Sequence, residues 1–148
     1  EQLRSLAENE DVQHFMIFDL NDSRDLLKIA TGVLGGELAA AGDDVDEAVT
    51  RLERAIAIED ALAYDEPPPW PLPARQYLGQ ILLDAGRARE AERVYLADLE
   101  VFPRNGWSLL GLERSLLAQE ETTEAQSVAA ERAEAWQHAD VELPASRF

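Results

Sequence analysis

The side chains best suited to chemistry gather at a proline-rich stretch, residues 63–73, with the sequence AYDEPPPWPLP. Tyr64, Glu66 and Trp70 lie in it, and Arg75 follows closely. An aromatic ring beside a carboxylate and a guanidinium is the composition of an anchor pocket for a ligand. The alternative interpretation is structural, with the indole filling space beside the connector and Glu66 pairing with Arg75. The residues alone leave both interpretations open.

Elsewhere the sequence contains no arrangement typical of catalysis or metal binding. Its only histidines are His14 and His138, it has no cysteine, and neither histidine is spaced to act with a nucleophile or with further metal ligands. Gly35-Gly36 lies inside a helical pattern, which indicates close helix packing and not a phosphate-binding loop. Acid pairs such as Asp43-Asp44 fall at turns, where capping and solvation explain them. We therefore expect no enzymatic activity, no cofactor and no bound metal.

The overall charge narrows the classes of partner. The chain of 148 residues has 13 lysines and arginines against 30 aspartates and glutamates, a formal net charge of -17. This balance opposes binding to nucleic acid and anionic lipid, and no apolar run approaches the ~20 residues that a membrane span requires. The start at Glu1 favours a piece of a longer chain, and the lack of a signal-peptide pattern favours a cytoplasmic location.

Helical periodicity predicts the elements that must position these residues. Apolar residues recur at helical spacing over 24–41 and 45–61. Asn21, Asp22 or Ser23 is expected to cap the first of these helices, and Asp44 the second. Thr122 or Thr123 is expected to cap the last helix, which should end near Asp140. The predicted organisation is an N-terminal docking segment or remnant of an upstream repeat (1–21), a helix pair (22–62), a proline-rich connector (63–72), a second pair (73–103), a third pair (104–140) and a C-terminal tail (141–148).

Two details of this organisation concern apolar side chains. The run from Val12 to Leu20, VQHFMIFDL, is too short to assign to strand or helix, and we expect it to be buried against another element. The helix over 24–41 should bury a wide apolar face. The members of that face are Leu26, Leu27, Ile29, Ala30, Val33, Leu34 and Leu38.

The second and third helix pairs carry a repeat signature. Leu78-Gly79, Leu82, Ala91, Tyr95 and Pro103 stand at the spacings of the tetratricopeptide repeat (TPR), and Trp107 with Leu110-Gly111 supplies its Trp-x-x-Leu-Gly. Arg75 and Asp98 stand where the second pair would have the Trp and Ala of that pattern. With the motifs YDEPPPW and NGWSLLGL, residues 26 to 148 resemble the C-terminal part of a family of bacterial TPR proteins of largely unassigned function.

The resemblance implies an all-α, right-handed α-α superhelix of about three TPR-like helix pairs, in which each pair stacks on the next to bury its apolar stripe. It also implies a groove lined by the first helix of each pair. The residues assigned to that groove are almost all uncharged: Ile29, Gly32, Gly36, Ala39, Gln76, Gln80, Leu83, Asn105, Ser108 and Leu112. Such a groove suits an uncharged or apolar segment, either of a partner or of this chain, 12–20 or 143–148. The same stacking would bring Trp70 and Trp107 together along one rim.

These observations predict a TPR-type scaffold that binds a protein or peptide partner and has no catalytic activity. Its candidate binding residues are Tyr64, Glu66, Trp70, Arg75, Gln76, Gln80, Asn105, Trp107 and Ser108. Two alternatives stay open. One is a small-ligand-binding or enzymatic domain that uses the cluster of Glu66, Trp70 and Arg75, and the other is a structural repeat block that assembles into homo-oligomers.

Overall fold

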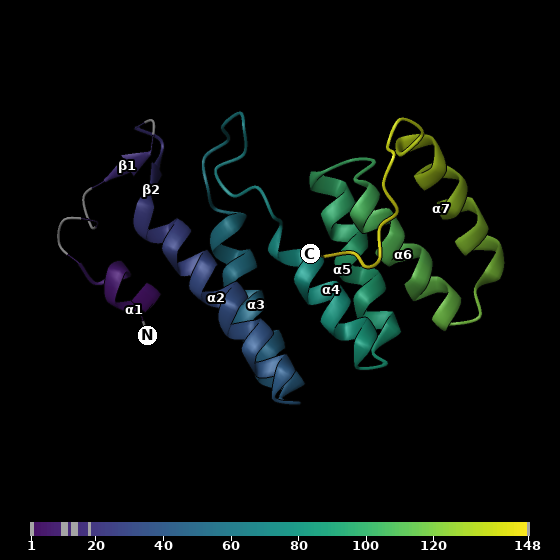
Figure 1. Cartoon of the computed structure of the whole chain (residues 1–148), viewed down its shortest axis with the longest axis horizontal. Coiled ribbons are helices and arrows are strands. Elements are labelled where there is room, and N and C mark those ends of the chain that lie inside the picture. The colour runs from purple at the N-terminus through teal and green to yellow at the C-terminus, as the bar shows by residue number, and fades with distance from the viewer. Residues whose placement is uncertain (1, 10–11, 13–14, 18, 148) are drawn as a thin grey trace. The chain divides into compact units, whose positions relative to one another are not determined.

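The computed structural model describes residues 2–9, 12, 15–17 and 19–147 (Figure 1). Within these ranges the chain is mainly helical, with helices packed on one another inside each part of the chain, which confirms the predicted all-α class. The chain divides into two compact units, residues 1–74 and 75–148, and each is described by itself. None of the helices in the described part of the chain combines the length and apolar content that crossing a bilayer requires.

The first unit is built around a helix pair, α2 (Ser23–Ala41) and α3 (Val45–Glu59). A short helix, α1 (Gln2–Ala7), contacts α2. The pair approaches closely because α2 has glycines where it meets α3: a Cβ added at Gly36 would stand 2.7 Å from the Cγ of Leu52. The chain turns after Gly42, between the two predicted helices, and Asp44 caps α3 as predicted by accepting a hydrogen bond from the N–H of Glu47 at 3.1 Å.

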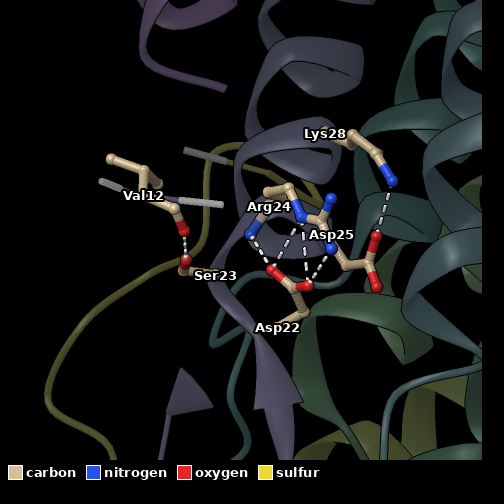
Figure 2. Close-up of polar contacts among 6 residues, drawn as sticks. All are labelled: Val12, Asp22, Ser23, Arg24, Asp25 and Lys28. Atoms are coloured by element: carbon tan, nitrogen blue, oxygen red, sulfur yellow. Dashed lines mark hydrogen bonds and ion pairs between the residues drawn. The ribbon is translucent and has the colours of Figure 1, made fainter. Parts of the chain in front are cut away.

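A small hairpin precedes α2 and leads into its first turn. Strands β1 (Met16–Ile17) and β2 (Asn21–Asp22) pair antiparallel. Asp22, one of the three candidate capping residues, caps α2 by accepting the N–H of Arg24 at 2.8 Å, and the Arg24 guanidinium donates to the same carboxylate at 2.6 Å (Figure 2). The hydroxyl of Ser23 donates to the carbonyl of Val12 at 2.8 Å, which ties the segment before the hairpin to the helix start.

The apolar run around the hairpin is not buried as expected. Phe15 is 63% exposed, and Met16 and Leu20 are exposed as well. Successive side chains of a strand point to opposite faces, so Ile17 is half-buried while Met16 faces away. Gln13, His14 and Phe18, which belong to the same run, lie outside the described residues. The expectation of burial is therefore wrong for the three exposed side chains.

The predicted apolar face of α2 is also narrower than expected. The residues that are fully buried form one stripe, Ile29, Val33 and Gly36, at the spacing of one helix face. Leu38 is 66% exposed and Leu34 is exposed too, because both lie to the side of that stripe. The prediction that these two leucines are buried is wrong.

The proline-rich connector after α3 has no helix, as predicted, and it is anchored at both ends within the first unit. The buried side chain of Asn21 holds Ala63 by two hydrogen bonds, accepting its N–H at 2.8 Å and donating to its carbonyl at 3.0 Å. At the other end, Glu59 accepts the N–H of Ala74 at 2.9 Å. These contacts satisfy backbone groups that a proline-rich segment cannot pair internally.

The second unit contains four helices in chain order: α4 (Ala74–Asp84, whose first residue belongs to the first unit), α5 (Ala88–Val101), α6 (Gly106–Ala118) and α7 (Thr122–Ala135). Gly86 turns the chain between α4 and α5 with φ of 72°, a conformation that favours glycine. Tyr95 of α5 is completely buried, with Gly79 of α4 and Gly111 of α6 both against its ring. One aromatic side chain therefore joins three helices.

The last helix differs from the prediction at both ends. Its N-cap is Glu121, which makes no side-chain capping hydrogen bond, so neither Thr122 nor Thr123 is the cap. It ends at Ala135 instead of near Asp140 because Trp136 leaves the helix with its ring against Gly106. The indole N–H of Trp136 donates to the carbonyl of Val141 at 3.1 Å, which directs the following segment back toward α6.

Candidate functional site

The residues predicted to bind a partner are divided between the two units. Tyr64, Glu66 and Trp70 belong to the first unit. The others belong to the second: Arg75, Gln76, Gln80, Asn105, Trp107 and Ser108. A rim that combines Trp70 with Trp107 therefore stays a prediction, and the two groups are considered separately.

In the connector, Glu66 has a partner two residues away. The hydroxyl of Tyr64 donates to Oε1 of Glu66 at 2.5 Å, and this hydrogen bond raises the pKa of Tyr64. Tyr64 is 80% exposed, so the pair lies on the surface. Trp70 is half-buried, and its indole nitrogen is buried with no hydrogen-bond partner among the residues described. The contacts inside this unit thus link Glu66 with Tyr64 and leave Trp70 apart from that pair.

Asn105 and Trp107 act at the start of α6. The side chain of Asn105 accepts the N–H of Trp107 at 3.0 Å and so caps the helix. The Trp107 ring meets Trp136 edge to face, with the ring centroids 6.3 Å apart and the planes at 84°. Asn105 and Trp107 are half-buried. Asn105 caps α6 and Trp107 packs against Trp136 at the end of α7, so both have a structural role.

Gln76 and Ser108 belong to a buried polar cluster around Asp98 of α5. The Ser108 hydroxyl donates to Oδ2 of Asp98, and the Gln76 amide approaches the Ser108 hydroxyl at 3.5 Å. Asp98 is fully buried, and its Oδ1 atom has no hydrogen-bond partner in the described part of the chain. Burial raises the pKa of Asp98, while Ser108, Arg75 and Gln76 lower it in part. The cluster is enclosed by helices and offers no open surface.

Gln80 has a different position, because its side chain holds the segment that follows α7. Ser146 donates to Oε1 of Gln80 twice, from its backbone N–H at 3.1 Å and from its hydroxyl at 3.1 Å. The Tyr95 hydroxyl lies 2.5 Å from the Ser146 hydroxyl and is the donor when Ser146 donates to Gln80. Ser146 is completely buried in the site that Gln80 and Tyr95 form, which is named the slot below. Gln80 and Tyr95 therefore recognise both a backbone group and a hydroxyl.

The slot is oriented by charged groups at its edges. Asp84 accepts the amide Nε2 of Gln80 at 2.8 Å, which turns Oε1 toward Ser146. The second carboxylate oxygen of Asp84 lies 4.0 Å from the guanidinium of Arg147. On α6, Arg114 donates to the carbonyl of Pro144 at 2.9 Å. The segment 141–147, named the tail segment below, thus passes over α6 and reaches α4, as the yellow trace in Figure 1 shows.

The chemistry of the slot is that of hydrogen bonding and charge pairing. Its polar atoms are an amide, a phenol, a carboxylate and a guanidinium, which together match a backbone N–H, a hydroxyl, a carbonyl and a cation. Burial raises the pKa of Tyr95, so the phenol stays a neutral donor. Within the ranges that the structure covers, no three His, Asp or Glu residues come together to hold a metal ion.

A second concave surface lies between α2 and α3 in the first unit, with a volume of about 230 Å³. Its lining is Lys28, Thr31, Gly32, Arg51, Arg54, Ala55 and Ile58. Two of its cations already have carboxylate partners: Lys28 lies 2.8 Å from Asp25, and Arg51 lies 2.7 Å from Glu47. The slot in the second unit is the stronger candidate because its polar groups already hold a segment of the chain.

The repeat spacing predicts Gln80 in a groove. Of the two segments of the chain predicted to fill such a groove, 143–148 is the one whose described residues contact Gln80. Phe148 itself lies outside the described residues. The roles of Tyr95 and Ser146 were missed, since Tyr95 looked like an apolar core residue of a helix.

Comparisons of the chain with protein families, with curated proteins and with solved structures gave no match.

Proposed function

We propose that this protein is a TPR-type interaction scaffold that binds an extended segment of a protein partner and has no catalytic activity of its own. The observation that supports this proposal is the seated tail segment. Ser146 is completely buried, and the side chains of Gln80 and Arg114 hold backbone groups of an extended chain. Backbone groups are common to all peptides, so a surface that satisfies them is suited to peptide binding.

The charge of the chain is consistent with a protein partner. With a formal net charge of -17, it repels nucleic acid and attracts basic protein segments. Asp84, at the edge of the slot, already faces the guanidinium of Arg147. The proposal therefore includes a partner segment that carries positive charge, and a cytoplasmic location remains part of it.

The test is partner capture from the source cells with three versions of the full chain: the natural sequence, Gln80→Leu, and Glu131→Gln as a control on the exposed surface of α7. Circular dichroism and urea unfolding verify the fold of each. We expect the natural chain and the control to capture the same protein, and Gln80→Leu to lose it because its side chain accepts no hydrogen bond. Equal capture by all three would contradict the proposal.

The rim of Trp70 and Trp107 supplies a further comparison in the same experiment. A chain with Trp70→Ala and Trp107→Ala tests whether the partner contacts these rings instead of Gln80. If only this variant loses the captured protein, the partner binds at the tryptophans and the slot is not its site. Loss with Gln80→Leu alone supports the slot.

A further inference from the structure

The contacts of Ser146 are typical of a specific recognition site and differ from those of a segment that only fills space. A segment that only fills space would bury apolar side chains, whereas the side chain most deeply buried here is a serine whose N–H and hydroxyl are both hydrogen-bonded. Val141, Glu142 and Pro144 are exposed, and Leu143, Ala145 and Arg147 are half-buried. Ser146 is thus the deepest anchor of the tail segment, and a similar segment could replace it.

The slot is also built from parts that do not depend on the tail segment. Gly79 and Gly111 fix the ring of Tyr95 from two helices and place its hydroxyl at the base of the slot. Asp84 fixes the amide of Gln80, so the acceptor already faces the slot. Donor and acceptor are therefore preorganised, which lowers the cost of binding a segment from outside.

We propose that this slot recognises a partner segment that contains Ser-Arg, and that residues 144–147 of the chain occupy it as a built-in competitor. The serine contacts Gln80 and Tyr95. The following arginine is attracted by Asp84, while Arg114 binds a backbone carbonyl that any residue two positions before the serine supplies. This inference rests on the proposed scaffold function and names the chemistry of its partner.

Competition within one chain has a measurable consequence. A segment joined to its site by a short linker competes at an effective concentration on the order of millimolar. The natural chain must therefore bind an added segment weakly, and a chain whose own segment is displaced must bind it more tightly. Ser146→Trp supplies that chain, because the buried site beside Tyr95 has no room for an indole. Glu142→Trp, at an exposed position of the same segment, is the matched control.

The experiment measures binding of a fluorescently labelled peptide with the sequence of residues 141–148, VELPASRF, by anisotropy. We expect Ser146→Trp to bind at least about tenfold more tightly than the natural chain or Glu142→Trp. Adding Gln80→Leu to Ser146→Trp should abolish the gain. A peptide with the Ser146→Ala change should bind about tenfold more weakly, because it leaves Gln80 and Tyr95 without a partner. No binding by folded Ser146→Trp, or equal binding of the two peptides, overturns the proposal.

A second measurement uses the natural chain and does not depend on the stability of a variant. Unlabelled peptide is added to millimolar concentration while the amide resonance of Ser146 and the side-chain amide of Gln80 are followed by nuclear magnetic resonance. Displacement should move the Ser146 resonance toward its value in a free chain. A resonance that stays fixed at saturating peptide shows that the segment is permanently docked and overturns the proposal.

Two further outcomes separate this inference from the proposed function. If partner capture depends on Gln80 but the peptide does not bind, the scaffold function stands and the proposed Ser-Arg recognition is wrong. If the natural chain doubles its mass with concentration and Ser146→Trp abolishes this, two copies exchange tail segments. That result overturns the assignment of the slot to a separate partner, and sedimentation measures it directly.

Discussion

The phenol ring of Tyr95 lies so close to the backbone of Gly111 that a Cβ at residue 111 would overlap the ring carbons. Gly79 stands in the same relation to the ring from α4. The absence of two side chains therefore creates the space for one large aromatic residue, whose hydroxyl then reaches Ser146. Helix packing and segment recognition share this residue.

Gly111→Ala should destabilise the second unit by about 1–3 kcal/mol, since the added methyl group forces the buried ring to move. Urea unfolding followed by circular dichroism measures the change in free energy. Gly42→Ala is the control, because a Cβ there would stand at 3.4 Å from the nearest atom, an ordinary contact. If Gly111→Ala and Gly42→Ala lose equal stability, the inference that Gly111 makes a close contact with the Tyr95 ring is wrong.

Asp98→Asn should change how stability depends on pH. Burial raises the pKa of Asp98 in the folded state, so the folded protein favours the protonated carboxyl. The contribution of this group to stability is therefore complete below the unfolded value of 3.8 and is lost as pH rises through the raised folded pKa. We expect the stability of Asp98→Asn relative to the natural chain to increase from pH 4 to pH 7.

Urea unfolding at several pH values tests this expectation for Asp98. Comparing each variant with the natural chain at the same pH cancels the titration of the other acids. Asp140→Asn, an exposed aspartate beyond α7, should show no such trend. A relative stability of Asp98→Asn that is constant between pH 4 and pH 7 would show that the buried carboxyl does not titrate as inferred.

Asp22 should show the opposite sign. Hydrogen bonds from the side chain and backbone of Arg24 lower the pKa of Asp22 from 3.8 to about 2. Its contribution to stability is present above pH 3.8 and is lost as pH falls through about 2. Asp22→Asn keeps a capping oxygen but loses the ion pair, so its disadvantage against the natural chain should vanish as pH falls through this interval.

Nuclear magnetic resonance titration of the Asp22 carboxyl carbon measures this pKa directly. Because the pair with Arg24 is at the surface, added salt should bring the value back toward 3.8. A pKa already at 3.8 in low salt would contradict the capping contact shown in Figure 2.

Trp107 at the start of α6 and Trp136 at the end of α7 should be energetically coupled. A double-mutant cycle with Trp107→Leu and Trp136→Leu isolates the edge-to-face contact from the burial of each ring. Contacts of this geometry contribute about 0.5–1.5 kcal/mol. Unfolding free energies of the two single variants and the double variant give the coupling, and a value near zero would mean that the rings only fill space.

The elements of this fold could be predicted from sequence wherever local chemistry decides them. Asp44 caps α3 as its pattern predicts, and Asp22 is the one of three adjacent candidates that caps α2. The end of α7 could not be predicted in this way. Trp136 leaves the helix because of its contact with Gly106, a residue of another helix that helical periodicity does not reveal.

The same distinction applies to the slot. Repeat spacing predicts Gln80 in a groove, whereas Ser146 belongs to a segment without periodicity. Its role depends on Tyr95 and Gln80, which precede it by 51 and 66 residues. Asp98 gave a visible signal, a carboxylate where the repeat pattern has alanine. What it contacts became clear only when Ser108 was placed beside it.

The buried carboxylate of Asp98 has a consequence for the order of the helices. Repeat arrays with apolar contacts can lengthen, shorten or change their sequence of units, because one apolar surface accepts another. Here α5 requires a hydroxyl from the helix that follows it, and Ser108 supplies it. A different helix at this place would remove the Ser108 hydroxyl from a buried carboxylate, so the packing of α6 on α5 is specific to this pair of helices.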